Sequence, residues 1–244
     1  MKKRLRITLL PALLLALLLP LPARAQQMAV DLELILMADA SGSIGEDEFQ
    51  LQRQGYAQAL LDPRVLDAIR HGRHGRVALA YVEWSGAHMQ HAIVPWTLIE
   101  AKTDLAFVAG QLLETPREIY FGGTAPGNAI LYGVASIQAN GFNGRRKVID
   151  ISGDGEDIDG IPATQGRDTA VAQGMTVNGL PIIEEWPELA AFFRDNIIGG
   201  PGAFHVPAKY FKDFGVAVRK KLIREIAGVG GTGEELAKMP EASK

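Results

Sequence analysis

Asp39-Ala40-Ser41-Gly42-Ser43 directly follows the apolar run Leu32–Met37, and the fold of the chain is decided at this junction. The apolar run is typical of a buried strand, and the polar residues stand where that strand ends and a helix begins. They offer one carboxylate and two hydroxyls at alternate positions. Oxygen donors at this density suit a hard divalent cation such as Mg²⁺, which keeps some of its positions for water or a ligand. The alternative is helix capping, because Ser and Asp are favoured before a helix.

Strand-like and helix-like segments alternate along the rest of the chain. The pattern predicts strands over 31–38, 76–84, 89–96, 147–152 and 175–183 and a short last strand over 203–206. It predicts helices over 46–61, 105–113, 128–138, 167–173, 187–196 and 208–227. Such alternation indicates crossover units, and we therefore expect an α/β fold of the Rossmann-like, doubly wound kind, with helices on both faces of a mostly parallel sheet. The short link between the second and third strands favours a hairpin, so one edge strand is expected to be antiparallel.

The first residues resemble a secretory leader rather than part of the fold. Lys2, Lys3, Arg4 and Arg6 precede the apolar run 7–21, and Ala23-Arg24-Ala25 fits a small-x-small cleavage site. The run is shorter than the roughly 20 residues that a spanning helix needs. We expect residues 1–25 to be a signal peptide, which makes the protein periplasmic or secreted. An uncleaved leader that anchors the protein in the membrane is the alternative, and no other stretch is long and apolar enough to span.

Charge and cysteine content exclude several classes of function. The leader holds five of the 25 basic residues and no acidic one, so the rest of the chain carries 20 basic against 28 acidic side chains, a formal net charge of −8. That balance argues against general nucleic-acid binding. The chain has no cysteine, which excludes disulfides, zinc–thiolate sites, iron–sulfur clusters and a cysteine nucleophile.

Two other loops are expected to meet the opening turn. In a doubly wound sheet, ligands bind beyond the carboxyl ends of the strands. Asp39 ends the first strand, Asp154 follows the strand over 147–152, and Thr124 lies in a Gly-rich loop before a helix. With Ser41 and Ser43, these residues would place three hydroxyls and two carboxylates at one rim.

This set of motifs resembles the metal-ion-dependent adhesion site (MIDAS) of von Willebrand factor A (VWA) domains. Asp39-x-Ser41-x-Ser43, Gly123-Thr124 and Asp154-Gly155 follow one another in the family's order. The resemblance covers nearly the whole chain after the leader and implies a VWA-like domain over residues 26–227, followed by a loose tail over 228–244. The phrases at 51–56, 81–86, 178–182 and 198–204 are similar to those of an uncharacterised bacterial subgroup of such proteins that carry signal peptides.

The resemblance also implies a role for each residue. Ser41 and Ser43 would bind the metal directly, and Thr124 directly or through water. Asp39 and Asp154 would act mainly through bound waters. The implied ion is Mg²⁺, with Mn²⁺ as a substitute, and an acidic side chain of a protein partner would complete its coordination.

One position departs from the family pattern, and other acids compete with the proposed ones. Gly153 stands where a threonine is common in the family, which leaves the position of Asp154 less well defined. Asp150 is a rival carboxylate, but strand alternation places it in mid-sheet. The acidic loop 154–159 resembles a calcium loop, yet it lacks the required acids at the first and twelfth positions of the EF-hand template and is interpreted as a solvated loop.

The sequence therefore favours an exported binding module without catalytic activity. No Gly-x-Ser-x-Gly elbow or Walker loop is present. Two alternatives stay open: a metal-assisted hydrolase that uses Asp39 or Asp154 to handle water, and a structural scaffold without a metal.

Overall fold

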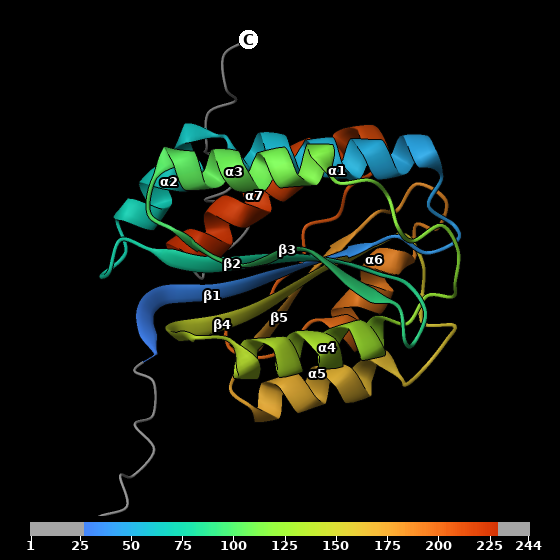
Figure 1. Ribbon diagram of the computed structural model, residues 1–244. Coiled ribbons are helices and arrows are strands. Elements are labelled where there is room, and N and C mark those ends of the chain that lie inside the picture. The colour runs from blue at the N-terminus through green and yellow to red at the C-terminus, as the bar shows by residue number, and fades with distance from the viewer. Residues whose placement is uncertain (1–26, 229–244) are drawn as a thin grey trace, which may run out of the picture.

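A five-stranded sheet runs through the middle of the computed structural model, which describes residues 27–228 (Figure 1). Its strands are β1 Met28–Asp39, β2 Val77–Trp84, β3 Gln90–Ile99, β4 Phe142–Gly153 and β5 Thr176–Pro181. Their order across the sheet is β3-β2-β1-β4-β5. All neighbours are parallel except β3, which pairs antiparallel with β2 at one edge. The mostly parallel sheet with one antiparallel edge strand is thus confirmed.

Helices cover both faces of the sheet (Figure 1). One layer consists of α1 Glu46–Leu60, α2 Pro63–Arg70, α3 Lys102–Glu114 and α7 Phe214–Ala227. The other consists of α4 Pro126–Ala139, α5 Ala163–Ala172 and α6 Leu189–Phe192, which continues as a π-helical turn over Phe193–Ile197. The doubly wound α/β architecture expected from the alternating pattern is confirmed.

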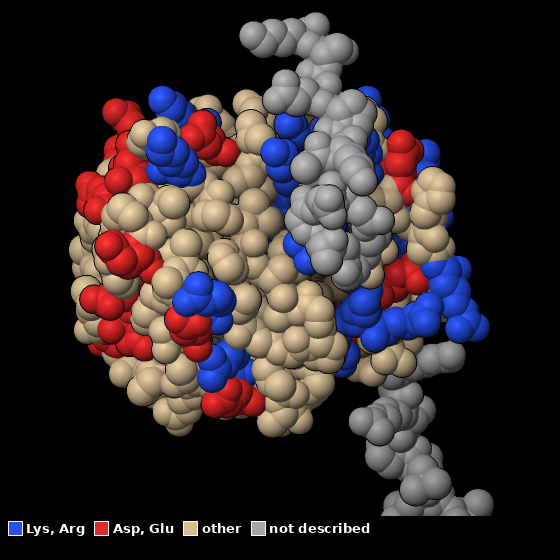
Figure 2. Space-filling model, turned by 180° about the vertical axis from the view of Figure 1, so that it is seen from behind, with Lys and Arg blue, Asp and Glu red and all other residues tan. Residues whose placement is uncertain are grey.

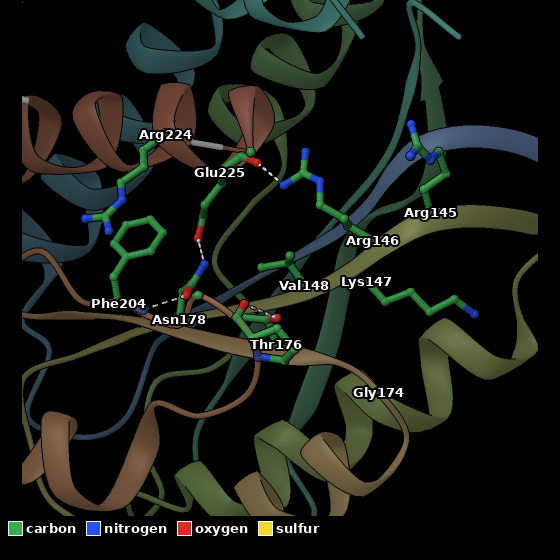
Figure 3. Close-up of a pocket in the computed structure, with 13 residues that line it drawn as sticks. Arg145, Arg146, Lys147, Val148, Gly174, Thr176, Asn178, Phe204, Arg224 and Glu225 are labelled. Atoms are coloured by element: carbon green, nitrogen blue, oxygen red, sulfur yellow. Dashed lines mark hydrogen bonds between the residues drawn. The ribbon is translucent and has the colours of Figure 1, made fainter. Parts of the chain in front are cut away.

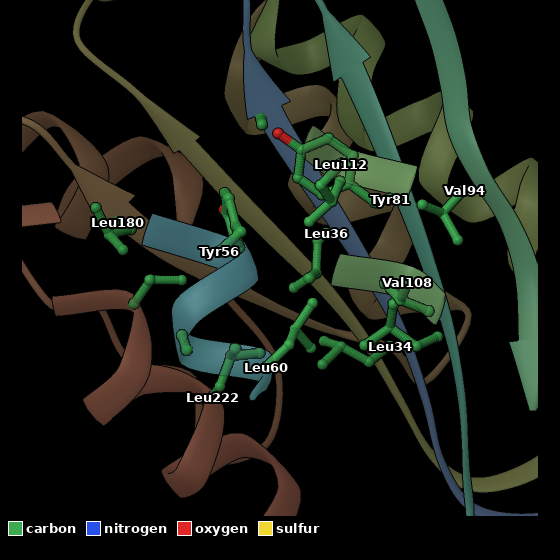
Figure 4. Packing of buried hydrophobic residues seen from close by; sticks show 14 of the residues in the cluster. Leu34, Leu36, Tyr56, Leu60, Tyr81, Val94, Val108, Leu112, Leu180 and Leu222 are labelled. Carbon is green, nitrogen blue, oxygen red and sulfur yellow. The ribbon is translucent and has the colours of Figure 1, made fainter. Parts of the chain in front are cut away.

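Two apolar cores lie on either side of the sheet because successive strand residues point to opposite faces. Leu34 and Leu36 of β1 pack toward α1 and α7 in the core that Figure 4 shows. Ile35 and Met37 belong to the second core, beneath α4 and α5. All four side chains are fully buried. Burial on both faces holds the central strands, and the loops at their ends, in fixed positions.

The strand order reverses between β1 and β4. From β1 the chain passes through α1 and α2 to β2 on one side, whereas β4 and β5 lie on the other side of β1. In open α/β sheets this reversal opens a crevice at the carboxyl ends of the two central strands, which is where ligands bind. Asp39 ends β1, and Asp154 directly follows β4.

Three details of the sequence-based assignment were wrong. Residues 203–206 do not form a strand: His205 contacts β5 through a single bridge to Gly179, and Pro207 then interrupts the ladder. The helix predicted over 208–227 begins only at Phe214, after a short 3₁₀ turn over Phe211–Asp213. Helix α2 was missed altogether. The predicted leader, residues 1–25, lies outside the described residues, as does most of the predicted tail.

Candidate metal centre

The turn after β1 is fixed by its own backbone and by neighbouring elements. The backbone N–H of Ser41 donates to Asp39 Oδ1 at 2.8 Å. Gln52 of α1 donates its side-chain amide to the Asp39 carbonyl at 3.0 Å. The N–H of Ala40 donates to the carbonyl of Trp84, at the end of β2, at 2.8 Å. These contacts hold the Asp39 side chain in the crevice, where it is 1% exposed.

Two serine hydroxyls connect this turn to the loop after β4. Ser43 Oγ donates to Asp154 Oδ1 at 2.9 Å, across 111 residues of sequence. Ser41 Oγ lies 3.2 Å from Ser43 Oγ. The structure therefore brings Asp39, Ser41, Ser43 and Asp154 together.

Thr124 lies in a third loop that rests on the other two. Gly42 donates its N–H to the carbonyl of Gly122 at 3.2 Å. The carbonyl of Thr124 accepts N–H groups from Ile158 and Asp159, at 3.1 and 3.2 Å. A Cβ atom at Gly155 would lie 3.5 Å from both Thr124 Oγ1 and Thr124 Cγ2, so the threonine side chain contacts the loop that carries Asp154. All five predicted site residues thus lie at one rim.

The rim holds two buried or half-buried carboxyl groups, Asp39 and Asp154, close to each other. Asp39 Oδ2 is buried and accepts no hydrogen bond from any of the described residues. Burial, together with the negative charge of Asp154, raises the pKa of Asp39 to about 7. Burial also raises the pKa of Asp154, against the hydrogen bond from Ser43, and Glu48 and Glu185 add to the increase. A buried carboxylate without a partner is costly, and a bound cation relieves that cost.

The residues present fit a hard cation. Carboxylate and hydroxyl oxygens converge on the crevice, and one buried carboxylate oxygen is left without a partner. Within residues 27–228, no three His, Cys, Asp or Glu side chains are grouped as metal ligands. An ion at this rim therefore depends on the hydroxyls of Ser41, Ser43 and Thr124.

Gly153 explains the departure from the family pattern. A Cβ atom at this position would lie 2.8 Å from Asp39 Oδ2 and 3.4 Å from the Trp84 ring. Glycine leaves room for the Asp39 carboxylate in its observed orientation, and a threonine would displace it. The sequence analysis treated Gly153 as a departure from the pattern, although a glycine at the end of a buried strand is a signal for a close approach of another group.

Other polar residues near the rim hold its loops in place through hydrogen bonds to backbone groups. Ser85 Oγ donates to the carbonyls of Phe121 and Gly123, at 3.1 and 3.0 Å. Asp159 Oδ2 accepts the N–H of Ala87 at 3.0 Å, and Asp157 Oδ2 accepts that of Ala163 at 2.6 Å. The loop interpreted from the sequence as solvated is thus tied down by two of its acids.

Comparison with known proteins places the chain among proteins without an assigned activity. The family model described as "Protein of unknown function (DUF1194)" matches residues 29–230. No curated protein sequence matches the chain. In the part of the chain that the structure describes, no helix is long and apolar enough to cross a membrane.

Several solved structures share the fold. Proximal thread matrix protein 1 from the mussel byssus superposes with a TM-score of 0.59 at 18% identity, over 83% of this chain and 50% of that one. A further structure of that protein has a zinc-occupied MIDAS motif. The pilus adhesin SpaC from Lactobacillus rhamnosus GG gives a TM-score of 0.59 at 16% identity, over 83% and 31% of the two chains. An aerotolerance-related membrane protein from Bacteroides fragilis gives 0.52 at 16% identity, over 81% and 100%. This chain spans half or less of the first two proteins, and these similarities establish a VWA-like fold.

Proposed function

The chain belongs to the DUF1194 family of proteins of unknown function, and we propose that it is a binding module that takes up a divalent metal ion at the rim and through it recognises a protein partner. The observation that carries this proposal is the buried Asp39 Oδ2, which has no partner among the described residues although two hydroxyls and a second carboxylate lie beside it. The metal-occupied motif in a neighbour of the same fold supports a metal at this place.

The five oxygen-bearing residues at the rim differ in how they would contact the ion. Ser41, Ser43 and Thr124 offer neutral oxygens, and Asp39 and Asp154 offer negative charge. We assign direct contact with the ion to the hydroxyls and contact through water to the carboxylates, with Mg²⁺ as the preferred ion. When bound, the ion supplies Lewis acidity that an anionic oxygen of the partner can satisfy. An acidic side chain is therefore the expected anchor of the partner.

Exposed apolar side chains beside the rim suit a protein partner rather than a small ion-binding ligand. Tyr120, Phe121 and Ile158 are 61%, 69% and 72% exposed. Phe121 adjoins the Asp39 turn, because its Cα lies 4.0 Å from the position that a Cβ would take at Gly42. Ile158 is held by the carbonyl of Thr124. Exposed aromatic and aliphatic side chains are enriched at protein interfaces, where they can surround the anionic contact to the ion.

We further propose that this module acts outside the cytoplasm. The basic residues, apolar run and cleavage site of residues 1–25 predict export to the periplasm or beyond. The residues concerned lie outside the described part of the chain, so export is part of the proposal.

A magnesium-dependent capture experiment tests the proposal. The wild-type chain, without its leader, is immobilised and exposed to envelope extract in Mg²⁺ or EDTA, beside Ser41→Ala/Ser43→Ala. We expect one partner to bind only to the wild type and only in Mg²⁺. When the acidic residues of that partner are replaced one at a time, one of the replacements should abolish binding.

Matched variants separate the metal from the apolar surroundings. Thr103→Ala/Thr169→Ala removes the hydroxyls of an exposed residue of α3 and a half-buried residue of α5, away from the rim, and should bind as the wild type does. Phe121→Ala should weaken capture of the partner while leaving metal binding intact. Capture that is equal in EDTA, or equal with the double serine variant, contradicts the proposed function.

A further inference from the structure

The edge of the sheet opposite the candidate metal centre carries a concentration of arginines. Figure 2 shows basic side chains gathered at one edge of the molecule and acidic ones at the other. The acidic edge is the rim, with the first turn of α1 and the loop 154–159. The basic edge lies at the amino ends of β1, β4 and β5. We call the surface formed by Arg73, Arg145, Arg146 and Arg224 the arginine face.

Two adjoining hollows shape the arginine face. One has a volume of about 260 Å³ and is lined by β4, the start of β5 and the end of α7. The other has a volume of about 580 Å³ and lies between the start of β1 and the loop after α2. Arg145, Arg146 and Gly228 line both, so the two hollows adjoin each other at these residues. Two acids also line it: Asp31 in the larger hollow and Glu225 in the smaller.

Both acids are engaged elsewhere. Asp31 accepts the backbone N–H of His74, at 2.8 Å. Glu225 Oε1 accepts from the side-chain amide of Asn178 at 2.8 Å (Figure 3). It also accepts from Lys221 Nζ at 2.6 Å. The arginines are therefore not neutralised by direct ion pairs with these two acids.

Two of the four arginines are held in place by neighbouring groups, and the other two are exposed. Arg146 donates to the carbonyls of Glu225 and Ile226, which hold its guanidinium without removing its charge. Arg224 stacks on the Phe204 ring at 3.7 Å, and its buried Nε has no hydrogen-bond acceptor among the described residues. Arg73 and Arg145 are exposed and form no ion pair with any residue in 27–228. The face thus presents two exposed guanidinium groups, those of Arg73 and Arg145, without an anionic partner among the described residues, whereas Arg146 and Arg224 lie within the electrostatic influence of Glu225.

The arginine face lies close to the point where the apolar run near the amino terminus joins the domain. Strand β1 begins at Met28 on this edge, and the apolar run 7–21 ends only seven residues earlier. Seven extended residues span about 25 Å at most. If the leader stays in a bilayer, a chain that emerges at residue 21 therefore has its arginine face within reach of the lipid headgroups, with the metal rim at the opposite edge of the sheet.

We propose that the arginine face binds the anionic phospholipid headgroups of a membrane surface. Guanidinium groups pair well with phosphate, and each cation near an anionic surface contributes about 1 kcal/mol. Binding in this orientation leaves the rim free for a protein partner. The lipid contact does not depend on a metal at the rim, and it serves a cleaved chain and an anchored one alike.

Vesicle sedimentation in EDTA tests the proposal, because EDTA removes any contribution of the rim. The chain without its leader, residues 26–244, is mixed with vesicles of phosphatidylglycerol and phosphatidylcholine or of phosphatidylcholine alone. We expect sedimentation only with the anionic vesicles, weakened by salt. Arg73→Gln/Arg145→Gln removes two exposed cations and should weaken binding about thirty-fold, from about 1 kcal/mol for each cation.

Lys209→Gln/Lys212→Gln is the matched control. It removes the same number of charges from two exposed lysines near the carboxyl end of β5, far from the arginine face. Vesicle binding should stay within about two-fold of the wild type. Equal binding to neutral vesicles, no binding to anionic ones, or equal losses in the two double variants overturn the proposal. Inorganic phosphate that stabilises the protein and displaces the vesicles at low concentration indicates a site for free phosphate, which also overturns it.

Discussion

Asp39 and Asp150 are both buried carboxylates on central strands, but the chain supplies a counter-charge to only one of them. Asp150 is fully buried in mid-sheet and contacts the ammonium group of Lys221, which is itself fully buried. Asp39 is equally buried but forms no ion pair with any of the described residues, and its nearest charge is the negative one of Asp154. Burial raises the pKa of both, to about 8 for Asp150 and about 7 for Asp39. The core thus contains its own cation, whereas the proposed function requires the rim to receive one from outside.

Removing the internal cation should have the largest effect. Lys221→Met leaves Asp150 and Glu225 together in the core without their lysine. Breaking a buried pair in this way costs about 3–5 kcal/mol of the free energy of unfolding, as measured by urea denaturation. Asp39→Asn should change that free energy by less than about 1 kcal/mol in EDTA, since Oδ2 accepts no hydrogen bond from the described residues and the new amide oxygen can still accept the N–H of Ser41. Equal losses in the two variants contradict the comparison.

Adding Mg²⁺ should stabilise the protein through the rim and not through Asp150. At a Mg²⁺ concentration one hundred times its dissociation constant, the wild type should gain about 2.7 kcal/mol, seen as a rise in melting temperature. Asp39→Asn should abolish that rise and Asp150→Asn should retain it. A rise that survives in Asp39→Asn places the ion elsewhere.

The two carboxylates also predict a dependence of stability on pH. The pKa of Asp150 is raised from 3.8 to about 8 by burial and by the charge of Glu225, against the charge of Lys221. Because the folded state then holds a proton that the unfolded chain releases, stability falls as the pH rises between these two values. The slope from this group is at most about 1.4 kcal/mol per pH unit.

Asp150→Asn is the variant that tests this slope in EDTA. The groups that face Asp150 are Lys221 and Glu225 from α7 and Tyr56 from α1, whose pKa is raised further above its usual range by the charge of Asp150. The variant should show a shallower fall in the free energy of unfolding from about pH 6 to pH 8, with the part due to Asp39 retained. An unchanged slope means that Asp150 is not the group that titrates.

Crowding Asp39 should have the smallest effect. In Gly153→Ala the added Cβ would lie 2.8 Å from Asp39 Oδ2 and force the carboxylate to turn. We expect a loss of about 1 kcal/mol in stability and a several-fold weaker Mg²⁺ affinity by titration calorimetry. Gly141→Ala is the matched control, because a Cβ there meets nothing within 4 Å. Similar Mg²⁺ affinities in the two alanine variants argue against the tight fit at Gly153.

The fold and the rim were largely predictable from the sequence because both follow from local patterns. Apolar runs and helical spacing determine the layers, and parallel strands bring Asp39 and Asp154 to one edge. Helix α2 was missed because Asp62-Pro63 was interpreted as the end of a helix. Proline is equally suited to a first helical position, and the Asp62 side chain caps α2 by accepting the N–H of Arg64.

The internal counter-charge could not be predicted from helix patterns. Lys221 and Glu225 stand four residues apart, which is the spacing of an exposed ion pair on a helix surface. Their burial follows from the packing of α7 over the sheet, a long-range property. The available signal was Asp150 itself, since a carboxylate inside the run Val-Ile-Asp-Ile requires a partner.

Equilibrium dialysis against Mn²⁺ tests most directly whether the rim is built to receive a cation. The account predicts one ion bound per wild-type chain, displaced by Mg²⁺, with the same stoichiometry in Asp150→Asn and none in Asp39→Asn. A wild-type chain that binds no ion, or an Asp39→Asn variant that binds Mn²⁺ as the wild type does, contradicts it.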